Sequence, residues 1–264
     1  MEAIVTIRTG FITGTGFYTL PNMQTRKSEQ VSTPFGNVGV QIASLEGQEI
    51  AFIPRHGVEH NLAPDDINYR ANIYALHELG VERILATSVC GSLVEDWPPG
   101  TLVLIDQFLN FSYGRRDSFY PLDGKLAHVD VTDPYCPSLH DALTISASEL
   151  GVDLQRGATY ACFSGPRFET RAEIEMVRRL DGHLVGQTNY PECVLARELA
   201  MCYATLGVVS NPAAGMGSNL SVNEVMQNLE DLGDIIGRLF ERVVRSLPES
   251  YDCPCRHALD EALL

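Results

Sequence analysis

Basic residues are scarce in this sequence, and long apolar runs are absent. The 264 residues include 19 Lys and Arg against 34 Asp and Glu, so the formal net charge is −15 at pH 7. Nucleic acids and anionic membrane surfaces are bound through basic faces, so this balance argues against both as partners. No apolar stretch reaches the roughly 18 residues of a membrane-spanning helix. Polar residues interrupt the first ten positions, where a signal peptide needs a continuous apolar segment, and we therefore expect a cytoplasmic protein.

Closely spaced cysteines are also scarce. Cys253 and Cys255 form the one close pair among seven cysteines, and a single C-x-C lacks the second pair that a zinc motif needs. The sequence therefore predicts no metal site, and we interpret the pair as an inert feature of the tail, with a redox clip as the alternative. The other five are interpreted as small reduced hydrophobic residues: Cys90, Cys136, Cys162, Cys193 and Cys202.

The overall pattern is that of an α/β protein. Hydrophobic residues make up 45% of the chain and charged residues 20%, which excludes a disordered chain. Short β-branched runs alternate with amphipathic segments, which predicts a single three-layer domain with a central mixed, mostly parallel sheet between helices. We expect this domain over residues 1–248, and a tail with a short helix over residues 249–264. The expected strands are Ile4–Thr13, Val38–Leu45, Glu49–Pro54, Arg83–Ser88, Thr101–Phe108, Gly157–Phe163, Gly182–Gly186 and Thr205–Ser210, and the expected helices are Asp66–Leu79, Pro137–Leu150, Arg171–Leu180, Cys193–Ala200 and Val222–Ser246.

Anion-binding side chains follow several of the expected strands. In such sheets ligands sit beyond the carboxyl ends of the strands, and arginine and hydroxyl donors there suit a phosphate group. A G-T-G turn at residues 14–16 follows the first expected strand. It is not a P-loop, because the Lys of that motif is missing, and it is not a dinucleotide fingerprint, because the third Gly is missing. His56 and His60 have i, i+4 spacing, but Gly57 argues against a helix and no third metal ligand lies nearby. The candidate phosphate-binding residues are Thr15, Arg55, His56, Ser88 with its neighbour Val89, and Thr188.

A second group of residues suits a purine base. The segment S-G-P-R-F-E-T at residues 164–170 joins an expected strand to an expected helix. Within it, Phe168 can stack on a heteroaromatic ring and Glu169 can accept hydrogen bonds from ring N–H groups. Asn211, close to Ala213 at the end of the last strand, offers both a donor and an acceptor.

Five segments in order resemble the trimeric purine nucleoside phosphorylase and 5′-methylthioadenosine phosphorylase family. They are R-H-G (55–57), N-Y-R-A-N (68–72), A-T-S-V-C-G-S-L (86–93), G-P-R-F-E-T (165–170) and Y-P-E (190–192), and the resemblance covers roughly residues 10–246. It implies the phosphorylase fold, a homotrimer, and exchange of a purine for phosphate at C1′ of a ribosyl group. Inorganic phosphate is then a co-substrate, and no cofactor is expected.

The resemblance also implies roles for single residues. It assigns phosphate binding to the candidate residues that follow the expected strands, from Thr15 to Thr188, and it places Phe168 near the sugar and base. Gln187 stands where the family usually has Met beside the ribose hydroxyls, which leaves sugar specificity open. His128 matches a histidine that reaches into the site of the neighbouring subunit.

Two subfamilies differ at the base-binding positions. Adenine-specific methylthio enzymes carry T-D-x-D where this chain has S-N-P-A at residues 210–213, whereas 6-oxopurine enzymes carry the counterparts of Asn211 and Glu169. The physical argument agrees. A Glu169 carboxylate can accept from N1–H of hypoxanthine, and Asn211 can serve O6 and N7, but neutral adenine presents a lone pair on N1. A buried polar group left without a partner costs free energy, so a site built for a 6-oxopurine discriminates strongly against adenine.

The sugar end favours a methylthio substrate. Val222 replaces the His that 6-oxopurine enzymes carry in L-S-H-E-E-V, and Val225 lies one turn further on. An apolar wall there suits a methylthio group and leaves a hydroxyl unpaired. The alternative is that both valines are only core positions of the final helix.

These observations lead to the hypothesis of 5′-methylthioinosine phosphorolysis to hypoxanthine and 5-methylthioribose 1-phosphate. Asn211, Glu169 and Arg55 are the expected catalytic residues, and Val222 and Val225, with His128 from the neighbouring subunit, form the expected 5′ pocket. The alternatives are a methylthioadenosine phosphorylase, a general inosine/guanosine phosphorylase, a nucleosidase that uses water, and a nucleoside-binding protein without catalysis.

Overall fold

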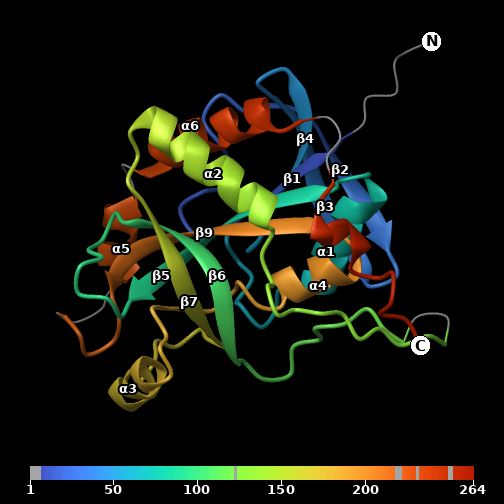
Figure 1. The fold of residues 1–264 in the computed structure, drawn as a ribbon. Coiled ribbons are helices and arrows are strands. Elements are labelled where there is room, and N and C mark those ends of the chain that lie inside the picture. Colours follow the sequence, from blue (N-terminus) through green and yellow to red (C-terminus); the bar gives the residue numbers. More distant parts are fainter. Residues whose placement is uncertain (1–6, 122–123, 218–221, 230–231, 249–251) are drawn as a thin grey trace, which may run out of the picture.

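The computed structural model describes residues 7–121, 124–217, 222–229, 232–248 and 252–264. Nine strands form one sheet in the order β2-β3-β4-β1-β5-β8-β7-β6-β9 (Figure 1). Because β9 also pairs with β5, the strands from β5 to β9 close into a ring. The strands are β1 (Thr9–Thr13), β2 (Gln24–Thr33), β3 (Gly36–Leu45), β4 (Gln48–Pro54), β5 (Arg83–Ser92), β6 (Leu102–Phe111), β7 (Leu154–Phe163), β8 (Leu184–Gly186) and β9 (Cys202–Pro212).

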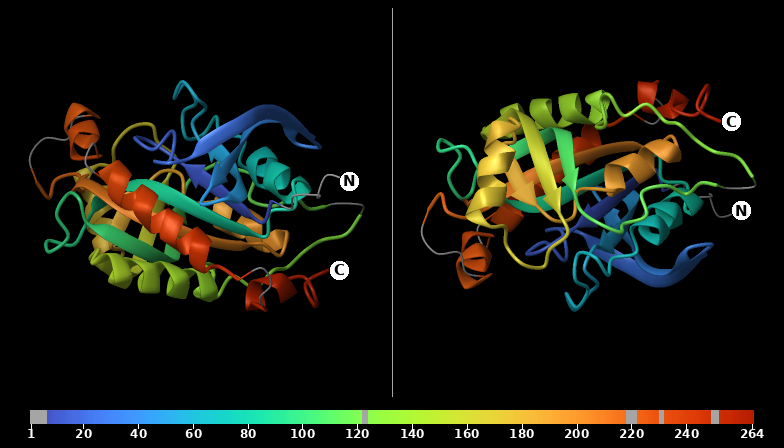
Figure 2. Two further views of the ribbon diagram at one scale, coloured as in Figure 1. Left: turned by 90° about the horizontal axis from the view of Figure 1, so that it is seen from above. Right: turned by 90° about the horizontal axis from the view of Figure 1, so that it is seen from below.

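Helices cover both faces of the sheet (Figure 2). Side chains alternate along the strands, so Phe11 and Phe52 pack with the core of α2 and α6, whereas Ile12 and Ile53 pack with the core of α1 and α4. The expected α/β architecture with a mixed sheet is therefore confirmed. The helices are α1 (Tyr69–Glu78), α2 (Pro137–Leu150), α3 (Arg171–Arg179), α4 (Glu192–Glu198), α5 (Val222–Leu229) and α6 (Leu232–Ser246), and a short 3₁₀ helix, η1 (Pro254–His257), follows in the tail.

The parallel pairings decide where a site can form. β1 runs parallel to both β4 and β5, and β5 runs parallel to β9. The carboxyl ends of these four strands therefore open at one edge of the sheet. The antiparallel pairings are β2 with β3, β3 with β4, β5 with β8, and β6 with β9.

The structure departs from the sequence-based expectations in two places. The exposed, polar strand β2 was not expected, because it is held by pairing with β3 rather than by burial of an apolar face. The final helix was expected to be continuous, but two helices lie on either side of residues 230–231: α5 contacts β9, whereas α6 packs on α2. The tail forms the short 3₁₀ helix η1 within the range expected for a helix, and its last residues pair with the chain at Ala127.

Within the described residues, no helix combines the length and the apolar character that crossing a bilayer requires. The expected first strand, Ile4–Thr13, corresponds to β1, which begins at Thr9. Residues 4–6 of the expected strand lie outside the described residues.

Candidate active site

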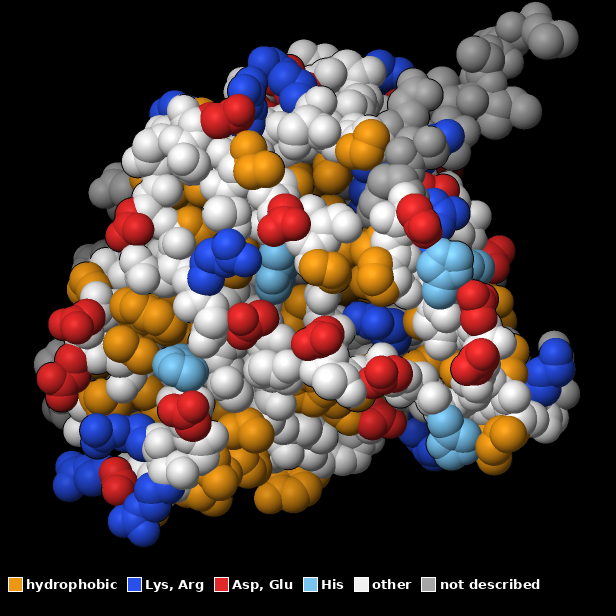
Figure 3. All heavy atoms as spheres, viewed as in Figure 1, with side chains coloured by type: hydrophobic (Ala, Val, Ile, Leu, Met, Phe, Trp, Pro, Cys, Tyr) orange, Lys and Arg blue, Asp and Glu red, His pale blue; other side chains and the backbone are white. Residues whose placement is uncertain are grey.

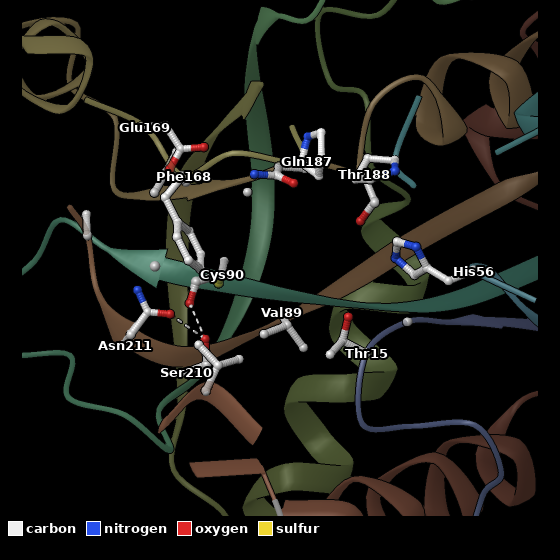
Figure 4. A pocket seen from close by; sticks show the side chains of 18 of the residues that line it. Thr15, His56, Val89, Cys90, Phe168, Glu169, Gln187, Thr188, Ser210 and Asn211 are labelled. Carbon is white, nitrogen blue, oxygen red and sulfur yellow. Dashed lines mark hydrogen bonds between the residues drawn. The ribbon is translucent and has the colours of Figure 1, made fainter. Parts of the chain in front are cut away.

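A cavity of about 260 Å³ lies at the edge where β1, β4, β5 and β9 end. All the expected anion-binding residues except Ser88 line one end of it, and the expected base-binding residues line the rest (Figure 4). The first group is Thr15, Arg55, His56, Val89 and Thr188, and the second is Phe168, Glu169, Gln187, Asn211 and Ala213. Val225 of α5 also lines the cavity.

Arg55 is a buried cation held by a buried carboxylate. Its Nε and Nη2 donate to Oε1 and Oε2 of Glu192 at 2.5 and 2.9 Å, and its other donors reach the carbonyls of Thr87 (2.8 Å) and Ile12 (3.4 Å). Burial alone would lower the pKa of Arg55, but the Glu192 carboxylate more than offsets this and raises it. A guanidinium has five N–H groups, so one on Nη1 remains for a ligand. Nη1 lies close to Gly14, where an added Cβ would be 2.9 Å from it.

Glu192 is a residue whose role the sequence did not reveal. It is fully buried, and the Tyr203 hydroxyl donates to its Oε2 at 2.8 Å. The Y-P-E segment contains it, but no local pattern links residue 192 to Arg55, which lies 137 positions away. Glu192 acts as a positioning residue, because it orients the arginine without lining the cavity.

His56 is neutral at pH 7. Its Nδ1–H donates to the Leu62 carbonyl at 2.9 Å, since a carbonyl can only accept, and Nε2 therefore carries the lone pair. Desolvation lowers the pKa of His56 to about 4, with smaller effects from its neighbours. His60, which the sequence analysis considered only as an unsupported metal ligand, also lines the cavity, and its ring centroid lies 4.6 Å from that of His56.

Two expected site residues, Ser88 and His128, do not line the cavity of this chain, and a third cannot be placed. The Ser88 hydroxyl donates to the Tyr160 hydroxyl on β7 at 3.1 Å, so it is bound within the sheet rather than directed into the cavity. His128 is exposed, and its backbone N–H donates to the Ala262 carbonyl in the tail. The Val222 side chain lies outside the described residues.

The base end of the cavity is formed by the loop before α3. Glu169 is 9% exposed, and its Oε1 has no hydrogen-bond partner among the described residues. Burial raises the pKa of its carboxyl. Phe168 is 42% exposed although it is a large aromatic residue, so its ring is available for stacking at the cavity.

Two devices hold this loop in place. Thr170 and Glu173 form a reciprocal capping box at the start of α3, which fixes the chain directly after Glu169. The Gln187 side chain donates to the Arg167 carbonyl at 2.9 Å, so it ties the end of β8 to the same loop. The departure from the family pattern at Gln187 therefore has a structural role in addition to its place on the cavity wall.

Asn211 presents one donor and one acceptor to a ligand. Its Oδ1 accepts from Ser210 at 2.7 Å and its Nδ2 donates to the Pro212 carbonyl at 2.8 Å. An amide has two donors and two acceptor lone pairs. One of each is left for a ligand, and these bonds keep the amide plane fixed.

Anion donors at one end of a cavity and an aromatic ring with polar groups at the other form a site of the kind that suits an anion together with a planar nitrogenous ring. Comparison with known proteins specifies the class. Residues 8–245 match the model of the phosphorylase superfamily. The chain belongs to this superfamily, which confirms the resemblance drawn from its motifs.

Three similar proteins illustrate the relationship. A probable 6-oxopurine nucleoside phosphorylase of Thermococcus kodakarensis is 46% identical over 262 residues, covering 97% of this chain and 98% of that protein. A probable S-methyl-5′-thioinosine phosphorylase of Methanopyrus kandleri is 45% identical over 255 residues, covering 96% and 98%. A solved methylthioadenosine phosphorylase from an antarctic soil metagenomic library has a TM-score of 0.91 and 34% identity, covering 98% of this chain and 93% of the other.

We expect His56 of the free protein to titrate with a pKa of about 4 and to keep its proton on Nδ1 at pH 7. Phosphate adds negative charge beside the ring, so it should raise this pKa. NMR of the imidazole nitrogens, with and without phosphate, measures both the tautomer and the midpoint. A midpoint at the ordinary value of 6.5 in the free protein would show that burial does not control the ring.

We expect Glu192→Gln to cost about 3–5 kcal/mol of unfolding free energy, because it leaves the Arg55 cation buried without its counter-ion. It should also raise the KM for phosphate, since the guanidinium loses its orientation. Glu198→Gln is the matched control: Glu198 is another buried carboxylate of α4, but it bonds Ser118 and Phe119 instead. Equal KM values for phosphate in the two variants would show that Glu192 does not position Arg55 for phosphate.

Proposed function

We propose that this chain catalyses phosphorolysis of 5′-methylthioinosine to hypoxanthine and 5-methylthioribose 1-phosphate. The observation that carries the proposal is the Glu169 carboxylate, a cavity-lining group with an unpartnered Oε1 among the described residues. A buried acceptor without a donor costs free energy until a ligand supplies one. N1–H of a 6-oxopurine is such a donor, whereas N1 of neutral adenine is itself an acceptor.

The phosphate end supports a phosphorolytic rather than a hydrolytic reaction. Thr15, Arg55 and Thr188 offer donors, together with the segment around Val89, and the neutral His56 can accept from a phosphate hydroxyl through Nε2. The Arg55–Glu192 pair carries no net charge, so the anion is held by directed donors rather than by a bare cation. A nucleosidase that uses water would have little use for this set.

The mechanism follows from the two ends of the cavity. As the bond between C1′ and the purine N9 lengthens, positive charge develops on the sugar, and the phosphate stabilises it electrostatically. Asn211 and Glu169 stabilise the electron pair that moves into the purine. A phosphate oxygen then bonds to C1′ as the bond to N9 breaks, and the purine leaves with the electron pair. The phosphate gives up its proton as it becomes the ester dianion and the purine takes one up, so no proton is gained or lost overall. The protein contributes mainly positioning.

The sugar preference rests on the apolar wall. Val225 lines the cavity with one part of its side chain and packs against the α2–α6 core with another. It therefore serves as both the core position and the pocket wall that the sequence left as alternatives. The role of Val222 at the 5′ group remains a prediction from the sequence.

The proposal includes a homotrimer. His128 is exposed and absent from the cavity wall of its own chain, which fits a residue that completes the cavity of a neighbouring protomer. The resemblance to trimeric phosphorylases supports this arrangement.

A substrate comparison tests the proposal. We expect kcat/KM for methylthioinosine to exceed that for methylthioadenosine by ~10²-fold or more, because adenine leaves the Glu169 carboxylate facing a lone pair. Turnover should require phosphate. Preference for methylthioadenosine would refute the base assignment, and equal turnover without phosphate would refute phosphorolysis.

We expect Glu169→Gln to lower kcat/KM for methylthioinosine by about 10- to 150-fold, the value of one hydrogen bond to a charged group. Glu175→Gln is the control, since Glu175 lies on the same α3 helix but pairs with Arg179 outside the cavity. An unchanged rate in Glu169→Gln would show that this carboxylate does not bind the base.

The second candidate is a general 6-oxopurine nucleoside phosphorylase, and His60 is the observation that favours it. Its imidazole is a polar group on the cavity wall that can bind a 5′-hydroxyl. The main proposal expects kcat/KM for inosine about 10-fold or more below that for methylthioinosine, because the apolar wall has no partner for the hydroxyl. Equal values, together with loss of inosine turnover alone in His60→Ala, would favour the second candidate.

A further inference from the structure

Four buried cysteines form a cluster outside the active-site cavity. They belong to the C-terminal tail, the start of α2 and the start of β9, and Figure 1 shows the red tail beside the start of β9. Cys136 is the N-cap of α2, Cys202 begins β9, and Cys253 and Cys255 lie at η1. Each is at most 1% exposed, and the four sulfur atoms all lie within 4.8 Å of one another. The tail thus supplies one pair of thiols. Cys136 and Cys202 supply the second pair that a zinc site needs, although they are distant from the tail in the sequence.

The sulfur separations suit a tetrahedral metal ion. Zn–S bonds of ~2.3 Å place neighbouring sulfurs of a tetrahedron ~3.8 Å apart. The Sγ atoms of Cys136 and Cys253 are 3.4 Å apart, and the other pairs stay within 4.8 Å. These separations are compatible with the four corners of one tetrahedron after small side-chain rotations. A site with four thiolates and no open position is of the structural type.

The surroundings can balance the charge of such a site. Four thiolates around one divalent cation leave a negative excess, which needs compensation when it is buried. Cys136 lies at the start of α2, where free backbone N–H groups and the helix dipole favour an anion. Arg197 lies close enough to act electrostatically on Cys255. Ser138 donates to the Cys253 sulfur at 3.6 Å.

We propose that Cys136, Cys202, Cys253 and Cys255 bind one zinc ion as thiolates. As each Zn–S bond forms, the thiol releases its proton to water, so no oxidant or reductant takes part. The ion joins residues 117 positions apart, such as Cys136 and Cys253. It therefore anchors the tail to the start of α2 and β9 and stabilises the folded domain.

Zinc analysis of the full-length protein, purified in reductant from zinc-supplied cells, tests this proposal. We expect about one zinc per chain, and after removal of zinc with a chelator, added Co²⁺ should give the visible spectrum of a tetrahedral tetrathiolate complex. Denatured wild-type protein should show all seven cysteines as free thiols once zinc is released.

The variants separate the site from general effects of cysteine loss. Cys255→Ser and Cys136→Ser should retain less than ~10% of the zinc, whereas Cys193→Ser, at a buried cysteine outside the cluster, should retain it fully. Wild-type protein that contains no zinc and takes up none in reductant would overturn the proposal. So would thiols missing in pairs, which would show disulfides, or stoichiometric iron in place of zinc.

Discussion

The buried ion pair between Arg55 and Glu192 organises the site. Arg55 follows β4 and donates to the carboxylate of Glu192 at the start of α4. It also donates to carbonyls of β1 and β5. One side chain therefore joins β1, β4, β5 and the start of α4 beside the cavity. Because the cation is neutralised within the protein, it can stay fully buried and still offer a directed donor to an anion.

The base end depends on a different kind of constraint. Glu169 and Phe168 sit on a loop, yet the loop is bounded by the capping box of α3 and tied to β8 through Gln187. Asn211 is held in the same way by Ser210 and the Pro212 carbonyl. The Asn211 amide thus has one donor and one acceptor committed to the protein and one of each left open, while Oε1 of Glu169 has no partner among the described residues. Under the proposed function, selectivity between 6-oxo and 6-amino purines rests on these open groups.

Much of the fold and the site could be predicted from the sequence because the signals are local. Apolar periodicity placed Pro137–Leu150 at the bounds of α2, and the residues after strand ends were expected to converge because parallel strands share an edge. The expectations failed where tertiary contacts override local pattern. The polar strand β2 forms because β3 pairs with it, and the final apolar stripe is divided because α5 and α6 pack on different elements.

The order of the motifs and the polar side chains after the strand ends could be identified from the sequence alone, since each depends on neighbouring residues. The same holds for the residues proposed to bind the purine. The tertiary structure alone decided which distant residues meet. Nothing near Arg55 in the chain indicates Glu192 as its partner, and the Cys253–Cys255 pair, interpreted along the chain as an inert tail feature, lies with Cys136 and Cys202 in space. Charge compensation and metal coordination depend on the distance between atoms in space, and this distance cannot be inferred from the separation of residues along the chain.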